Sequence, residues 1–167
     1  MYSSGEFVVY GIHGVCRILG TEKQLVNRKR SEFYVLEPIV QKGSKFYLPV
    51  DNPTALGKLK PLLSPEELKE LLNAEQIFID CWIPEDSYRK QAYRELLNNA
   101  DRLGLLQMLA SLYRFKDEQE IAGRKFHQCD DNFQRDAERV LLSEITLLME
   151  LPMDEAREFL RTHLRTK

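Results

Sequence analysis

The sequence predicts an α+β fold, in which a small β barrel or strongly bent antiparallel sheet is followed by an all-α helical domain. Short runs of β-branched and aromatic residues, spaced by about ten residues, fill residues 6–50. From residue 64 onward the apolar residues recur at helical spacing, and no further strand is needed. This change of period predicts two domains, residues 1–55 and 64–167, joined by a linker at residues 56–63.

The strands of the first domain are predicted from composition and from the turns between them. A polar segment (NRKRS, 27–31) has the character of a hairpin turn. Pro38 ends the strand predicted at residues 33–36. Four runs are rich in strand-forming residues, at positions 7–10, 15–19, 33–36 and 45–50.

The helical domain begins at a recognisable start signal. Ser64 can cap the helix, Pro65 fits its first turn, and Glu67 can complete a capping box. The segment before it, residues 51–63, contains two prolines and a glycine, as expected of a connection. The apolar residues at helical spacing predict a core made of Leu105, Leu109, Leu112, Val140, Leu141, Ile145 and Leu148.

Charge and hydropathy limit the classes of function. The chain has 24 basic and 26 acidic residues, a formal net charge of -2, but residues 1–60 hold nine basic and five acidic residues. The front is therefore basic and the remainder acidic, so nucleic-acid binding would need a local patch. No apolar stretch approaches the roughly 20 residues of a membrane span, and no secretory signal is visible. We expect a cytoplasmic protein without a membrane partner.

Motifs for catalysis and for metal binding are missing from the sequence. The three cysteines and three histidines do not stand at metal-ligand spacing, although His127 and Cys129 are close. No phosphate-binding loop, dinucleotide fingerprint, zinc-protease motif or nucleophile elbow is present. We therefore expect no enzymatic activity, no catalytic residue, no metal, no cofactor and no small-molecule substrate.

Three strings in the first domain resemble a known family. They are GEFVVYGIHGVCRI (5–18), FYVLEPI (33–39) and KFYLPVDN (45–52), and they are similar to the N-terminal module of CarD/CdnL bacterial transcription factors. The same module occurs in transcription-repair coupling factors, but their helicase motifs are missing here. The residues that match the module's pattern are Gly5, Val8, Val9, Tyr10, His13, Gly14, Tyr34, Leu36 and Pro49.

The resemblance implies a non-enzymatic transcription regulator. Its β module would be Tudor-like and would bind the RNA polymerase β subunit through a sheet edge. Gln24 and Tyr47 stand where familiar members have arginine, and Lys23 and Lys45 are the residues that can supply the charge instead. The alternative is an ordinary exposed edge strand protected by lysines. The expected polymerase-binding residues are Glu22, Lys23, Gln24, Lys45 and Tyr47.

The helical domain would contact promoter DNA near the upstream edge of the open bubble and stabilise the open complex. The resemblance implies a tryptophan that acts as a minor-groove wedge, and Trp82, the only tryptophan, precedes a helix entry at residues 84–86. Basic residues follow it, and Lys90 and Arg94 share a helix face. The expected DNA-binding residues are Trp82, Arg89, Lys90, Arg94, Arg124 and Lys125.

Each DNA-binding residue also has a structural interpretation. Trp82 can belong to a core with Ile79 and Ile83, and residues 124–125 can form a solvated loop after Gly123. The segment IPED (83–86) separates Trp82 from the basic helix by about four residues more than in familiar members, and its two acids would repel phosphates. The rival hypothesis is therefore a polymerase-binding interaction module without productive DNA binding.

Overall fold

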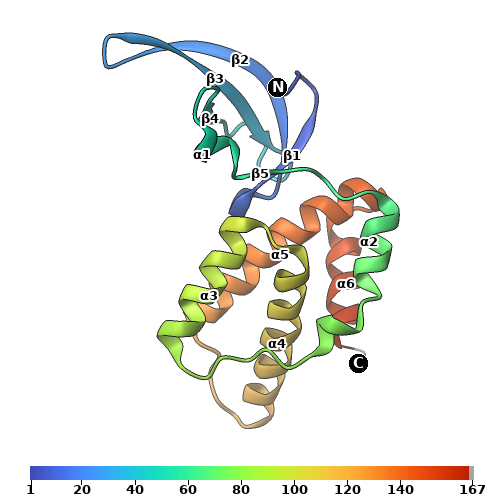
Figure 1. Cartoon of the computed structure of the whole chain (residues 1–167). Coiled ribbons are helices and arrows are strands. Elements are labelled where there is room, and N and C mark those ends of the chain that lie inside the picture. Colours follow the sequence, from blue (N-terminus) through green and yellow to red (C-terminus); the bar gives the residue numbers. More distant parts are fainter. Residues whose placement is uncertain (166–167) are drawn as a thin grey trace.

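A computed structural model describes residues 1–165 and confirms the α+β arrangement. A five-stranded antiparallel sheet precedes a helical bundle, and the two are stacked along the long direction of the molecule (Figure 1). The strands are β1 (Phe7–Tyr10), β2 (Val15–Val26), β3 (Lys29–Pro38), β4 (Phe46–Pro49) and β5 (Leu59–Lys60). The helices are α1 (Pro53–Leu56), α2 (Pro65–Leu72), α3 (Asp86–Asn99), α4 (Arg102–Ile121), α5 (Gln128–Met149) and α6 (Met153–Arg165), with 3-10 turns η1 (Gly11–His13) and η2 (Glu75–Phe78).

The sheet is bent and open, so the barrel alternative is wrong. The strand order is β4-β3-β2-β1-β5, and every pair is antiparallel. A barrel requires the two edge strands to pair with each other. Here the edges are β4, with four residues, and β5, with two, and they lie at opposite sides of the sheet.

The hairpin between β2 and β3 is longer than the sequence predicts. The turn consists of Asn27 and Arg28 alone, whose φ angles of 50° and 64° suit a two-residue hairpin turn. The prediction of a polar turn over residues 27–31 is wrong for residues 29–31, which pair with β2 as part of β3. Cross-strand hydrogen bonds stabilise this ribbon, whose mostly polar side chains are open to solvent on both faces.

The connection between sheet and bundle has its own structure. Helix α1 is capped by the Asn52 side chain, which accepts a hydrogen bond of 3.1 Å from the Ala55 N–H. After it, β5 pairs with β1 and places Leu59 opposite Tyr10. The segment predicted as the linker, residues 56–63, thus includes the last strand of the sheet. The predicted capping box of α2 is present, since Ser64 and Glu67 exchange both hydrogen bonds.

Two hydrophobic cores meet at the ends of β1 and β2. We call them the sheet core, under the bent sheet, and the helical core, inside the bundle. Neighbouring strand residues point to opposite faces, so Val8 and Cys16 lie in the sheet core while Val9 and Val15 lie in the helical core. All predicted residues of the helical core are buried there except Leu148, which is only partly buried: Leu105, Leu109, Leu112, Val140, Leu141 and Ile145.

A close backbone contact, which we call the joint, connects residues 11–15 to helix α5. The Val15 N–H donates a buried hydrogen bond of 2.9 Å to Ser143 Oγ, and this hydroxyl donates to the Val140 carbonyl. Gly14 has a φ of +70°, and a Cβ at this position would lie 2.5 Å from Ser143 Oγ. Only glycine allows the turn to approach the helix so closely.

We expect Gly14→Ala to destabilise the protein by about 2–4 kcal/mol. The left-handed backbone costs about 1–2 kcal/mol for a residue with a Cβ, and the new methyl group overpacks the joint at a further cost of about 1–3 kcal/mol. Urea unfolding of the full chain measures the loss. Ser143→Ala is the matched control: in the double variant the methyl group no longer meets the hydroxyl, so the two losses should be less than additive. A loss below about 0.5 kcal/mol for Gly14→Ala would contradict a tight joint.

Candidate functional site

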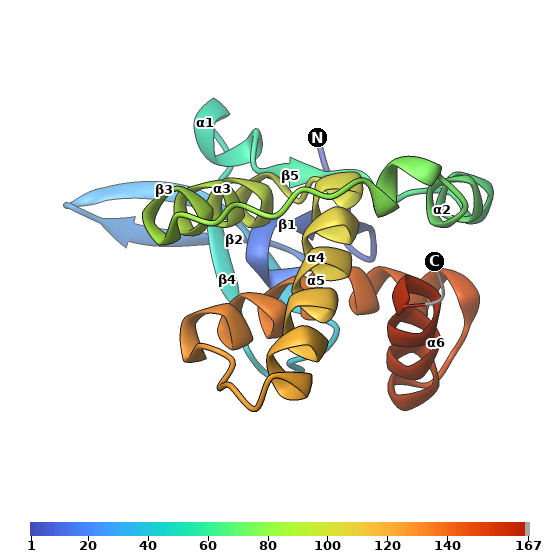
Figure 2. The same cartoon turned by 90° about the horizontal axis from the view of Figure 1, so that it is seen from below.

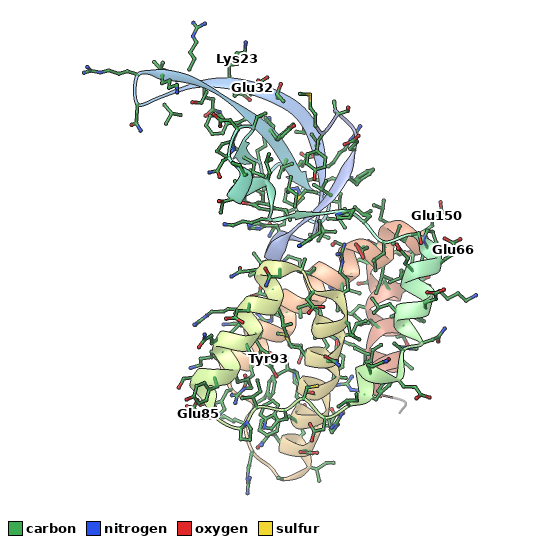
Figure 3. The ribbon with its side chains drawn as sticks, in the orientation of Figure 1. Lys23, Glu32, Glu66, Glu85, Tyr93 and Glu150 are labelled. Carbon is green, nitrogen blue, oxygen red and sulfur yellow. The ribbon has the colours of Figure 1, made fainter. Side chains whose placement is uncertain are left out.

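The sequence-predicted site residues form two groups at opposite ends of the molecule. One group lies on β2 and near β4, and the other lies around the N-terminal end of α3 and the turn after α4. Figure 3 shows this separation, with Lys23 on the projecting hairpin and Glu85 at the far end of the helical bundle. The chain therefore presents two separate surfaces, and each is described by itself below.

The sheet group divides between the two faces of the sheet. Tyr34 belongs to the sheet core, so its neighbour Phe33 and the opposite residue Glu22 face outward. The same alternation places Gln24 and Tyr47 on this outer face. Lys23 lies on the other face, opposite Glu32 in the register, and Figure 3 shows the two labels close together on the hairpin. Lys45 is exposed and comes immediately before β4. The structure therefore brings Glu22, Gln24 and Tyr47 to one face, and Lys23 to the other.

Strand β2 has a free edge beside these residues. Pairing with β1 ends at Arg17, and hydrogen bonds exchanged with residues 4–6 continue only to Leu19. Within the described residues, no strand pairs with residues 21–26 on the side away from β3. The free N–H and C=O groups of such an edge can accept a strand from another chain. This edge runs directly beside Glu22, Lys23 and Gln24.

Trp82 is neither fully buried nor free. Its indole stacks on Phe115 of α4, with ring centroids 4.1 Å apart and planes inclined by 20°. The guanidinium carbon of Arg89 lies 4.6 Å from the indole centroid, which is cation–π geometry. The side chain is half-buried at the margin of the helical core. These contacts fix the orientation of the indole and leave part of it exposed.

Arg89 lies inside the bundle and is held by two carboxylates. Its exposed fraction is 3%, and its Nε and Nη2 atoms each donate to Asp130 at 3.0 Å. Nη2 also contacts Asp86 at 2.8 Å, and Nη1 donates to the Ile83 carbonyl. Burial alone would lower the pKa of Arg89, but the hydrogen bonds and charges of Asp130 and Asp86 raise it. This position ties α3 to α5 and does not favour the predicted contact with a phosphate.

The acids before α3 also have local partners. The Glu85 side chain caps the helix and accepts hydrogen bonds from the N–H groups of Ser87 and Tyr88. The hydrogen bond from the Ser87 hydroxyl and these N–H bonds lower the pKa of Glu85, and the contact with Arg89 lowers that of Asp86. Both carboxylates are therefore charged at neutral pH. They stand next to the predicted DNA-binding surface, where they oppose phosphate binding.

The remaining predicted DNA-binding residues are accessible. Arg94 is exposed and Lys90 half-exposed on one face of α3. Arg124 and Lys125 are exposed in the connection between α4 and α5, after Gly123 with its φ of +69°. Sequence reasoning missed the exposed apolar side chains of this end, including Ile121 at 89%. An isoleucine two residues before the Gly-Arg-Lys segment, outside the predicted core, was the available signal.

Metal-binding and membrane-spanning features were searched for as well. Residues 1–165 contain no group of three or more His, Cys, Asp or Glu side chains that could hold a metal ion. No helix in the same part of the chain has the length and apolar character needed to cross a membrane.

Comparison with protein families gives a match for the segment that forms the sheet. Residues 2–60 match the family model described as the CarD-like/TRCF RID domain, which is an RNA polymerase interaction domain. The matched segment spans all five strands, η1 and α1, whereas α2 to α6 lie outside it. A comparison with curated proteins gave no match. The match supports a polymerase-binding role in transcription for the N-terminal part of the chain.

If Arg89 is structural, Arg89→Gln should destabilise the bundle by about 3–5 kcal/mol, because it leaves the carboxylate of Asp130 buried without its partner. Arg94→Gln makes the same charge change on the same helix at an exposed position and should cost less than about 0.5 kcal/mol. Denaturant unfolding of both full-length variants measures the difference. Equal and small losses would show that the buried pair contributes little.

Proposed function

We propose that the protein is a non-enzymatic transcription regulator, because residues 2–60 match the model of the CarD-like/TRCF RID domain. Its sheet binds the β subunit of RNA polymerase. Its helical domain contacts promoter DNA near the upstream edge of the open bubble and stabilises the open complex. The family match of the sheet is the observation that carries this proposal.

The free edge of β2 supports the polymerase contact. An added strand from the polymerase would find unpaired backbone groups along residues 21–24, next to the side chains of Glu22 and Gln24, and would leave the hairpin tip uncovered. Tyr47 reaches the same face across β3 and offers an exposed aromatic ring. Lys23 adds positive charge beside the free edge, and Lys45 adds it immediately before β4, on the far side of β3. Backbone pairing gives affinity in such contacts, and the neighbouring side chains select the partner.

The double variant Lys23→Glu/Lys45→Glu should weaken binding to polymerase at least tenfold, because it reverses the charge of Lys23 beside the free edge of β2 and that of Lys45 before β4. The double variant Lys42→Glu/Lys58→Glu is the control, since both lysines are exposed in the same domain and the change in net charge is the same. Biolayer interferometry with full-length protein and purified polymerase measures both. Equal affinities, with circular dichroism showing a retained fold, would place the contact elsewhere.

The DNA contact rests on the surroundings of Trp82. An apolar ring beside cations fits a minor-groove contact, because phosphate binding offsets the cost of unstacking. Lys90, Arg94, Arg124 and Lys125 supply accessible cations at this end of the bundle. Residues 61–167 carry 15 basic and 21 acidic residues, so free DNA would bind weakly. Attachment to polymerase raises the local concentration of DNA, and a weak contact then suffices.

A second candidate function is a polymerase-binding module without productive DNA contact. Two contacts of Trp82 favour this alternative. Its ring stacks on Phe115 and lies against the guanidinium of Arg89, so part of the indole surface is already in contact with the protein and is not available to DNA. The charged side chains of Glu85 and Asp86 favour it too.

Trp82→Ala distinguishes the two functions. If the indole contacts DNA, this variant should keep its affinity for polymerase and shorten the lifetime of the open complex several-fold. Lys90→Ala and Arg94→Ala should shorten it less, and more clearly at low salt. Competitor-challenged promoter complexes give the lifetime, and circular dichroism gives the fold. An unchanged lifetime would support the second candidate, and loss of helical structure would show that Trp82 serves the core.

A further inference from the structure

The end of the β2–β3 hairpin projects beyond the rest of the sheet. We call residues 23–31 the arm. Strand β1 pairs with β2 only up to Arg17, and β4 pairs with β3 only over residues 33–36, so the arm is a ribbon of two strands without neighbours. Figures 1 and 2 show it extending to the left, clear of both the sheet and the helices. No packing requirement of the fold explains a ribbon of this length.

The arm concentrates positive charge that has no partner in the chain. Arg28, Lys29 and Arg30 are consecutive and exposed, and none of them forms an ion pair with any described residue. No acid occurs between Lys23 and Ser31. The nearest one in the ladder, Glu32, lies opposite Lys23. The cations at the tip are therefore free to bind an anionic partner without breaking an existing interaction.

Cations and apolar side chains occur on both faces of the arm. Leu25 is opposite Arg30 in the register, and Val26 is opposite Lys29. Since neighbouring residues alternate between faces, one face carries Leu25 with Arg30 and the other carries Val26 with Lys29. Leu25 is 71% exposed and Val26 42% exposed. Each face of the tip thus carries one cation and one exposed aliphatic side chain.

We propose that the arm is a second DNA-contacting element, which inserts into a groove of duplex DNA. A two-stranded β-ribbon fits the major groove, whose walls are two negatively charged sugar–phosphate strands. A ribbon with cations on both faces meets phosphates on both walls. A protein surface would contact one face and leave the other cations unused, so the two-sided distribution favours DNA over an acidic protein.

The chemistry of the contact follows from the side chains. Arg28, Lys29 and Arg30 bind phosphates and release counterions, and this contact carries no sequence information. The aliphatic side chains of Leu25 and Val26 pack against sugars or base edges in the groove. The proposal extends the proposed function by giving the N-terminal domain its own DNA contact, separate from Trp82. It is tested without polymerase, so its failure and that of the proposed function are distinguishable.

The test compares two full-length variants with the same net charge. Arg28→Asn/Lys29→Gln/Arg30→Gln neutralises the arm, and asparagine tolerates the positive φ of position 28. Lys42→Gln/Lys58→Gln/Lys69→Gln neutralises three other exposed lysines. Fluorescence anisotropy with a labelled 20-base-pair duplex gives the affinity across a salt series. The slope of log K against log salt is negative, and its magnitude should fall by about 2.7 in the arm variant, because each lost phosphate contact removes about 0.9. The control should keep most of the wild-type slope.

Three results would overturn the proposal. Equal effects of both variants would show that only the net charge matters. Absence of DNA binding by the wild-type chain at the lowest salt would exclude a DNA contact of the arm. Loss of polymerase affinity in the arm variant, with unchanged DNA binding, would assign the arm to an acidic protein surface. Circular dichroism and thermal unfolding confirm that each variant keeps the fold.

Discussion

The architecture depends on the joint between the Gly11–Val15 turn and helix α5. The buried hydrogen bond from the Val15 N–H to Ser143 Oγ satisfies a strand donor with a helix side chain, and the missing Cβ of Gly14 lets the two elements touch. The period of two along β1 and β2 then commits neighbouring residues to different cores. Neither core can move relative to the other without exposing a valine. The sheet is consequently packed against the bundle through the joint.

Within the bundle, α5 is the element that the other helices share. It contributes a buried acid to each of three ion pairs, and the arginine comes each time from a different helix: Arg89 of α3 with Asp130, Arg102 of α4 with Glu144, and Arg161 of α6 with Glu138. Burial and the charge of Glu138 raise the pKa of Tyr113, which donates its hydroxyl hydrogen to that carboxylate. Buried pairs of this kind contribute little net stability, but a mispaired arrangement would leave charges unpaired. We therefore attribute to them the register of the helices around α5. Three of the acidic side chains of the helical domain are thus buried in ion pairs and do not add negative charge to its surface.

Local signals in the sequence were sufficient for local structure. The Ser64–Glu67 capping box and the helical core positions follow from spacing, and both are present, with Leu148 only partly buried. Closure of the sheet could not be predicted, because it depends on pairing between strands far apart in sequence. The same limit applies to Arg89: spacing places it on a helix, but its partner Asp130 lies 41 positions further on. Phe115, which stacks on Trp82, is similarly remote. From the sequence alone, Arg89 and Trp82 look free to bind a ligand. In the folded chain they contact residues that are distant in sequence.

This use of side chains also limits how Trp82 can meet DNA in the proposed function. Moving Arg89 away from the indole would break a buried, bidentate pair with Asp130, at a cost of several kcal/mol. Phe115 is anchored in α4 and covers the indole by stacking. Insertion of a bare indole face between base pairs is therefore unfavourable. The indole is only half-buried, and a contact through its exposed part at the margin of a bubble requires no rearrangement of the bundle. At that margin the base steps are already opening, so little unstacking remains to be done. An indole whose orientation is already fixed by Arg89 and Phe115 is then better suited to hold strands apart than to separate them.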